Sequence, residues 1–146
     1  MTKKITIAIA ACALFALMAG FHATVGAQGK SVADGVYSQA QAERGAKLYA
    51  EQCASCHGES MEGVADLFPA LKGETFAKNW GGKPLGEFYT KIAETMPALD
   101  PGTMKPEQVA DVVAHILSTS KFPAGSTDLA TSADALQQIQ IVAPKP

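Results

Sequence analysis

The sequence predicts a small all-α domain behind an N-terminal export segment. Apolar residues recur at helical spacing in several stretches, whereas few stretches show the alternation or the β-branched enrichment of strands. The length of 146 residues suits one domain, and neither an internal repeat nor a second core is visible. We therefore expect three to five helices around a single core.

Residues 1–27 have the composition of a secretory signal peptide. Lys3 and Lys4 precede an apolar run, and Val25-Gly26-Ala27 offers the small residues that a signal peptidase needs. The run is short for a membrane span, which takes about 20 residues. An uncleaved anchor is an alternative, and so is a lipoprotein with Cys12 lipidated. We expect cleavage and a periplasmic protein without a membrane span.

The charge of the mature chain limits its partners. The full sequence has 12 Lys and Arg against 14 Asp and Glu, and residues 1–27 contain two lysines and no acid, which leaves 10 − 14 = −4. No basic patch is visible, which argues against nucleic acid and anionic membranes as partners.

The first helix is predicted from Gln39 to Gln52. Residues 28–37 before it are polar, contain glycine and lack periodicity, so we expect a flexible lead-in. Ser38 is a typical N-cap, and Gln41 three residues later is positioned to complete a capping box. The helix then brings Cys53 to its C-terminal end.

A long glycine-rich stretch from His57 to about Pro84 is predicted to be irregular. Such a loop is unusual in a small domain unless it wraps a large ligand. Leu85–Thr95 returns to helical spacing and ends before Met96-Pro97, because a residue that precedes proline disfavours the helical region.

The strongest amphipathic pattern begins at Pro106, a residue suited to the first position of a helix, and ends near Ser120. We place the domain at residues 38–122. The tail, residues 123–146, has one weak helical segment, Ser132–Ile139, and is expected to pack on the domain.

The motif that carries chemistry is Cys53-Ala54-Ser55-Cys56-His57, the C-x-x-C-H pattern of covalent haem attachment. Two thiols at this spacing reach the two vinyl groups on one porphyrin edge, and the adjacent imidazole offers Nε2 to the iron. A disulfide, a redox dithiol and half of a zinc site are the alternatives. A thioredoxin-like dithiol needs a βαβ context, and a closed zinc site needs four ligands, whereas only His115 remains outside the motif in the mature chain. The sequence therefore predicts one haem c.

Further motifs surround this one. Gly45 and Tyr49 precede it at four-residue steps, and Phe68-Pro69-Ala70-Leu71 and Thr95-Met96-Pro97 follow. With them the stretch from Ser38 to Ser120 resembles the class I mono-haem c-type cytochromes. The resemblance implies a small all-α fold of three to five helices wrapped around one covalently attached haem. Four more segments are similar to the cytochrome c modules associated with quinoprotein alcohol dehydrogenases: Phe76-x-x-x-Trp80, Pro101-Gly102, Asp111-Val112-Val113-Ala114 and Phe122-Pro123-Ala124-Gly125.

The second axial ligand of the iron is predicted to be Met96, opposite His57. Met61 follows His57 too closely in the chain to cross the ring, and His115 lies on the terminal helix as a packing residue. In the family the ligand methionine precedes a proline, as Met96 does, whereas Met104 stands where relatives carry an apolar residue. Thioether ligation raises the reduction potential relative to a bis-His haem, so we expect a positive potential.

The resemblance also implies roles for residues around the haem. The Pro69 carbonyl accepts a hydrogen bond from Nδ1 of His57. Trp80 either donates its indole N–H to a haem propionate or packs against the ring. Seven apolar residues are expected to contact the haem: Leu67, Phe68, Leu71, Phe76, Phe88, Ile92 and Leu99.

Two positions depart from the family pattern. Gly45 allows a close crossing with the terminal helix, where relatives place an aromatic residue against the glycine, and this chain has His115 there. Lys105 occupies the N-cap position of the terminal helix, where relatives carry Ser or Thr.

The expected function is one-electron transfer, without enzymatic activity. A periplasmic dehydrogenase is expected to supply electrons, and a terminal oxidase or another cytochrome to accept them, with the chain as a monomer. One alternative is a dedicated subunit of a quinoprotein dehydrogenase. Another is a haem enzyme or gas sensor with an open sixth site, against which Met96-Pro97 argues. An acidic cluster after the motif, Glu59, Glu62 and Asp66, is either a solvated loop or a docking patch for a basic partner.

Overall fold

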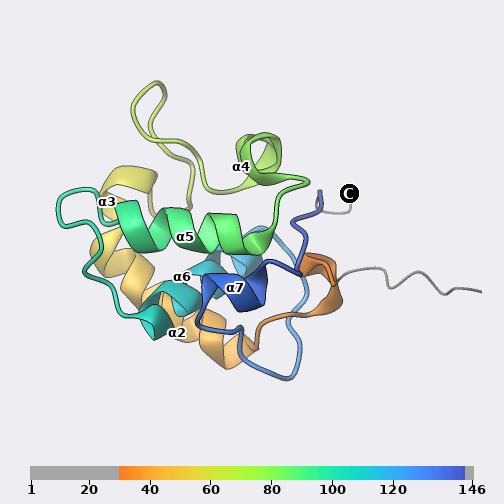
Figure 1. The fold of residues 1–146 in the computed structure, drawn as a ribbon. Coiled ribbons are helices and arrows are strands. Elements are labelled where there is room, and N and C mark those ends of the chain that lie inside the picture. The colour runs from red at the N-terminus through yellow and green to blue at the C-terminus, as the bar shows by residue number, and fades with distance from the viewer. Residues whose placement is uncertain (1–29, 144–146) are drawn as a thin grey trace, which may run out of the picture.

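The computed structural model describes residues 30–143 and confirms the all-α class (Figure 1). Between these residues the chain forms isolated β-bridges and no extended strand. The predicted signal peptide lies outside the described residues. The helical elements are η1 (Val32–Asp34), α2 (Gln39–Gln52), α3 (Ala54–His57), α4 (Gly73–Trp80), α5 (Leu85–Thr95), α6 (Pro106–Thr119) and α7 (Ala133–Leu136).

Helix α2 has the predicted bounds, and its N-cap is confirmed. Ser38 Oγ accepts a hydrogen bond from Gln41 N at 3.0 Å. The predicted capping box is wrong, because the Gln41 side chain turns away from the cap and pairs with the tail. Its Nε2 donates to Leu129 O at 3.3 Å, and its Oε1 accepts from Leu129 N at 2.6 Å.

Helices α2 and α6 cross closely, as expected from Gly45. A Cβ on Gly45 would stand 1.8 Å from the Asp111 carbonyl oxygen and 3.0 Å from the Cβ of His115. Beside this contact Arg44 donates to both carboxylate oxygens of Asp111, each at 3.0 Å. Arg44 also donates to Asp128 of the tail at 2.7 Å, so one guanidinium joins α2, α6 and the tail.

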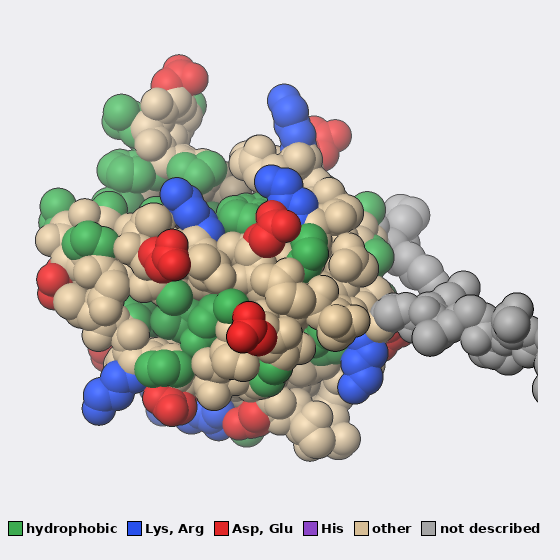
Figure 2. Space-filling view, in the orientation of Figure 1, with side chains coloured by type: hydrophobic (Ala, Val, Ile, Leu, Met, Phe, Trp, Pro, Cys, Tyr) green, Lys and Arg blue, Asp and Glu red, His purple; other side chains and the backbone are tan. Residues whose placement is uncertain are grey.

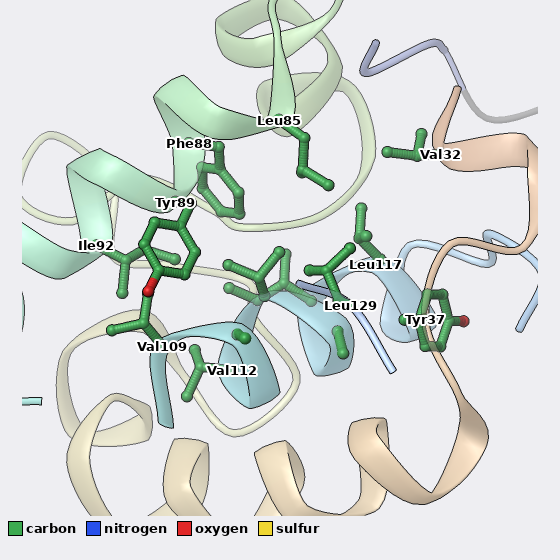
Figure 3. Close-up of a cluster of buried hydrophobic side chains, with 14 of the residues drawn as sticks. Val32, Tyr37, Leu85, Phe88, Tyr89, Ile92, Val109, Val112, Leu117 and Leu129 are labelled. Carbon is green, nitrogen blue, oxygen red and sulfur yellow. The ribbon is translucent and has the colours of Figure 1, made fainter. Parts of the chain in front are cut away.

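Helices α5 and α6 agree with the prediction to within one residue at their ends. The Lys105 side chain makes no capping hydrogen bond at the start of α6. The backbone N–H of Lys105 donates to Gln108 Oε1 at 2.9 Å, so Gln108 supplies one of the two bonds of a capping box. Figure 3 shows α5, α6, the lead-in and the tail contributing side chains to one buried cluster. It includes Val32, Tyr37, Leu85, Phe88, Tyr89, Ile92, Val109, Val112, Leu117 and Leu129.

The stretch predicted to be irregular contains a helix, α4. Phe76 and Trp80, one turn apart, place their rings 5.3 Å and 4.7 Å from the ring of Phe88 on α5. A helix of eight residues with two large apolar positions has too weak a period to be recognised in the sequence, and packing on α5 is what stabilises it.

From residue 30 onward the lead-in, for which the sequence predicts flexibility, packs against the rest of the chain. Val32 is fully buried, and its N–H donates to Gln140 O at 2.9 Å. Tyr37 donates its hydroxyl to Phe122 O at 2.6 Å. The lead-in therefore contacts both Gln140 of the tail and Phe122 at the end of the domain, and these contacts hold it against the core.

The tail lies against the domain and buries Leu129, Leu136, Ile139 and Ile141. Helix α7 covers only half of the predicted 132–139 segment, because the chain then extends to pair with the lead-in. In the part of the chain that the structure describes, no helix combines the length and apolarity needed to cross a bilayer.

Candidate haem-binding site

The C-x-x-C-H motif forms a tight turn at the end of α2. Cys53 N donates to Tyr49 O at 2.9 Å, which completes the last turn of α2, and His57 N donates to Cys53 O at 2.9 Å within α3. The two cysteines and His57 thereby reach the wall of one cavity. Because these backbone bonds join residues four apart, the spacing of the motif is enough to predict the turn.

The cavity is strongly apolar. Phe88 and Ile92 of α5 and Val112 and Ile116 of α6 line it, together with Leu71 and Trp80 from the connection between α3 and α5. Lys91 is the one residue with a permanent charge among those that line this cavity. A largely apolar cavity with few polar groups suits a flat, mostly apolar ligand.

The imidazole of His57 is buried and oriented. Its Nδ1 lies 2.9 Å from the Pro69 carbonyl oxygen, the pair that the resemblance predicts. A carbonyl can only accept, so Nδ1 is the donor in this pair and Nε2 is the ring nitrogen left to face a ligand. Tyr49 donates its hydroxyl to Gly58 O at 2.8 Å and so fixes the residue after His57.

Cys53 and Cys56 are not joined in a disulfide. Burial, followed by the nearby Cys56, raises the pKa of the Cys53 thiol to about 11. Catalytic dithiols have lowered thiol pKa values, so this environment argues against redox exchange and suits a neutral sulfur. Among residues 30–143 no three His, Cys, Asp or Glu side chains are arranged to hold a metal ion, so the zinc alternative has no ligand set there.

Of the candidates for a second axial ligand, only Met96 lies in the cavity wall. It is the C-cap of α5, where the backbone turns extended. Met61 and Met104 are buried in the core and do not line the cavity. His115 does not line it either, and its ring lies 5.4 Å from that of Tyr49.

Five of the seven residues expected to contact the haem line the cavity, and two do not. Phe76 is buried and packs its ring against that of Phe88. Leu99 is 98% exposed, because it follows Pro97 in the turn-rich loop after α5 and its side chain turns to solvent. Sequence reasoning also missed Lys91, which precedes Ile92 on α5 and could have been found from the helical spacing of Phe88 and Ile92.

The residues present fit a c-type haem. The cavity combines two unpaired thiols, an imidazole whose Nε2 is free and a methionine sulfur, the donor types that haem attachment and low-spin iron require. The all-α fold and this donor set define the class of protein as a class I c-type cytochrome.

Comparison with known proteins identifies the family. Residues 40–116, which are 77 of the 146 residues, match the family described as cytochrome c oxidase, cbb3-type, subunit III. The chain belongs to this family, carries a covalently bound haem c and is an electron-transfer protein.

A solved structure with a similar fold is the sulfane dehydrogenase SoxCD from Paracoccus pantotrophus. It matches with a TM-score of 0.52 and 21% identity over 75% of this chain and 62% of that chain, so the chain spans less than two thirds of it. At this identity the likeness shows the fold alone. No curated protein sequence matches the chain.

Proposed function

We propose that the protein is a periplasmic one-electron carrier with a single haem, attached through Cys53 and Cys56 and ligated by His57 and Met96. The observation that carries this proposal is that one apolar cavity gathers all four side chains, although Met96 is 39 residues beyond His57 in the chain. The bound haem supplies a reversible Fe(III)/Fe(II) couple. A filled sixth position suits electron transfer, because it leaves no site for substrates or gases.

The chain's own residues would keep that couple in one geometry. Pro69 holds the proton on Nδ1 of His57 and fixes the plane of the ring. The end of α5 presents Met96 at the cavity without a long mobile loop. Lys91 and Trp80, both in the cavity wall, are the proposed partners for the haem propionates, one as a cation and one as an N–H donor.

We further propose that the protein transfers electrons between a periplasmic dehydrogenase and an oxidase or another cytochrome. The family description names an oxidase subunit, and the similar structure is a dehydrogenase, so known proteins of both kinds contain domains of this sort. A dedicated subunit of a quinoprotein dehydrogenase is the close variant, and co-purification of an untagged dehydrogenase with the tagged chain would distinguish it.

Visible spectroscopy of the mature protein, made with haem-maturation machinery, tests the proposal. We expect a six-coordinate low-spin spectrum, a weak sulfur-to-iron charge-transfer band in the oxidised form, and no change when carbon monoxide meets the reduced form. A high-spin spectrum with ready carbon monoxide binding would contradict the carrier function and favour a haem enzyme or gas sensor. The mass of the periplasmic protein would show whether residues 1–27 are removed.

A further inference from the structure

Four large hydrophobic side chains remain exposed between residues 30 and 143, and three of them lie in one short segment. Val64, Leu67 and Phe68 are 45%, 73% and 36% exposed, and Leu99 is 98% exposed. The first three belong to the 63–68 hairpin, and Leu99 belongs to the 97–105 loop between α5 and α6. Exposed apolar residues concentrated in this way mark interaction sites more often than isolated ones do.

The 63–68 hairpin is a tight, internally bonded turn. Val64 N donates to Phe68 O, and Phe68 N donates to Val64 O, both at 2.9 Å. Gly63 N donates to His57 O at 2.8 Å and joins the hairpin to the haem motif. The hairpin projects from the body of the molecule (Figure 1). Because its backbone is already fixed, a contact made here costs little ordering entropy.

Both segments border the haem cavity. Leu67 and Phe68 line it from the hairpin, and Pro97 and Ala98 line it from the 97–105 loop. Val64 and Leu99 do not line it. A ligand in the cavity therefore accounts for part of the apolar surface but not for Val64, whose backbone pairs with that of Phe68, nor for Leu99, which directly follows Ala98.

Acidic side chains accompany these apolar residues. Asp66 lies at the turn of the hairpin, Glu62 just before it, and Asp100 directly after Leu99, all exposed. Figure 2 shows acidic and hydrophobic side chains together on the projecting part of the surface. Lys72 lies near Glu62 and offsets part of this charge.

We propose that the 63–68 hairpin and the 97–105 loop form the docking surface for a redox protein with an apolar centre surrounded by Lys and Arg. The acidic side chains would steer such a partner, and Val64 and Leu99 would contact its apolar centre beside the haem cavity. This inference rests on the proposed electron-carrier function and names the partner class for it.

Stopped-flow electron transfer tests the charge component, with the lysine-rich mitochondrial cytochrome c as the oxidant of the reduced protein. Asp66→Lys should slow the second-order rate about 10-fold at low salt, and the loss should shrink at about 1 M salt, where charges are screened within about 3 Å. Glu43→Lys is the matched control, since it changes the charge equally on an exposed position of α2, about 15 Å along the helix from Cys53. Equal slowing by both variants would overturn the proposal, because net charge alone would then explain it.

Leu99→Ser tests the apolar component without changing charge. Since Leu99 is almost fully exposed, the variant should fold normally and still slow the reaction several-fold at both salt concentrations. An unchanged rate would overturn the role of the 97–105 loop. The visible spectrum of each protein and its oxidation by ferricyanide distinguish failure of the carrier function from failure of the docking surface. If the haem of the wild type cannot be reduced and reoxidised, the carrier function is contradicted. If it can, but wild type and variants react with the protein oxidant at equal rates, only the docking surface is contradicted.

Discussion

Gly45 and Asp111 touch backbone to backbone where α2 crosses α6. A Cβ at position 45 would lie 1.8 Å from the Asp111 carbonyl oxygen and 2.5 Å from its carbonyl carbon. No side-chain rotation relieves such an overlap, because both groups belong to the main chains of packed helices. The crossing brings α6, with Val112 and Ile116, to the cavity that begins at the end of α2.

Gly45→Ala should therefore lower the free energy of unfolding by about 2 kcal/mol. Overpacking of a core typically costs about 1–3 kcal/mol, and an overlap with backbone belongs at the upper end of that range. Alanine gains roughly 1 kcal/mol over glycine in a helix, which offsets part of this cost. Denaturant unfolding followed by circular dichroism measures the difference. Glu43→Ala, on the exposed face of the same helix, is the control, and an equal or higher stability of Gly45→Ala would contradict the close crossing.

The bounds of α2, α5 and α6 followed from local signals: the Ser38 cap, the proline after Met96 and the proline at position 106. The packing of the lead-in and the helix α4 could not be predicted in this way, and the helix of the tail was predicted twice as long as it is. Val32 is buried because it pairs with Gln140, and α4 forms because its rings meet Phe88. Such long-range contacts leave no periodicity in the short segments that make them.

Replacement of Gln41 should release the tail. Its amide makes two hydrogen bonds with the backbone of Leu129, and its side chain is only 2% exposed. Gln41→Leu leaves a buried N–H and a buried carbonyl unpaired, which costs about 1–3 kcal/mol. Faster amide exchange around Leu129 should accompany the loss. Gln39 is exposed on the same helix, so Gln39→Leu should leave amide exchange in the tail unchanged. Unaltered exchange in Gln41→Leu would show that the Gln41 side chain does not hold the tail on α2.

His115 should make stability depend on pH. Burial lowers the pKa of His115, so in the folded protein the ring stays neutral against Tyr49, while in the unfolded chain it takes up a proton below about pH 6.5. Above about pH 6.5 His115 is neutral in both states and does not reduce stability. As the pH falls from 6.5 toward the lowered pKa of the folded state, the unfolded chain binds more protons than the folded one, so the free energy of unfolding decreases. The nearest carboxylate on α6, Asp111, one turn before His115, is already paired with Arg44.

Unfolding midpoints of the wild type and of His115→Phe between pH 5 and 8 measure this effect. The phenylalanine keeps a ring against Tyr49 and removes the titrating group, so its midpoint should fall less on acidification than that of the wild type. Parallel curves for the two proteins would show that His115 does not titrate in this range.

Local spacing predicted the motif of the candidate site, and the family resemblance predicted distant residues such as Met96 and Pro69. Cys53, Cys56 and His57 sit in one helical turn, so their spacing defined them. Leu99 was expected among the residues that contact the haem, yet the loop turns its side chain to solvent. The orientation of a loop residue depends on the path of the chain, which the sequence pattern does not record.

Met96 and Met104 offer a matched pair for the iron ligand, since both lie between α5 and α6 and only Met96 lines the cavity. Leucine conserves their volume and removes the sulfur, and such swaps usually cost less than about 1.5 kcal/mol. Met96→Leu should abolish the sulfur-to-iron band, convert the iron to a form that binds carbon monoxide, and lower the reduction potential. Met104→Leu should keep the band and the potential, because Met104 packs in the core. The opposite pattern would transfer the ligand to Met104 and require the 97–105 loop to rearrange when the haem is attached.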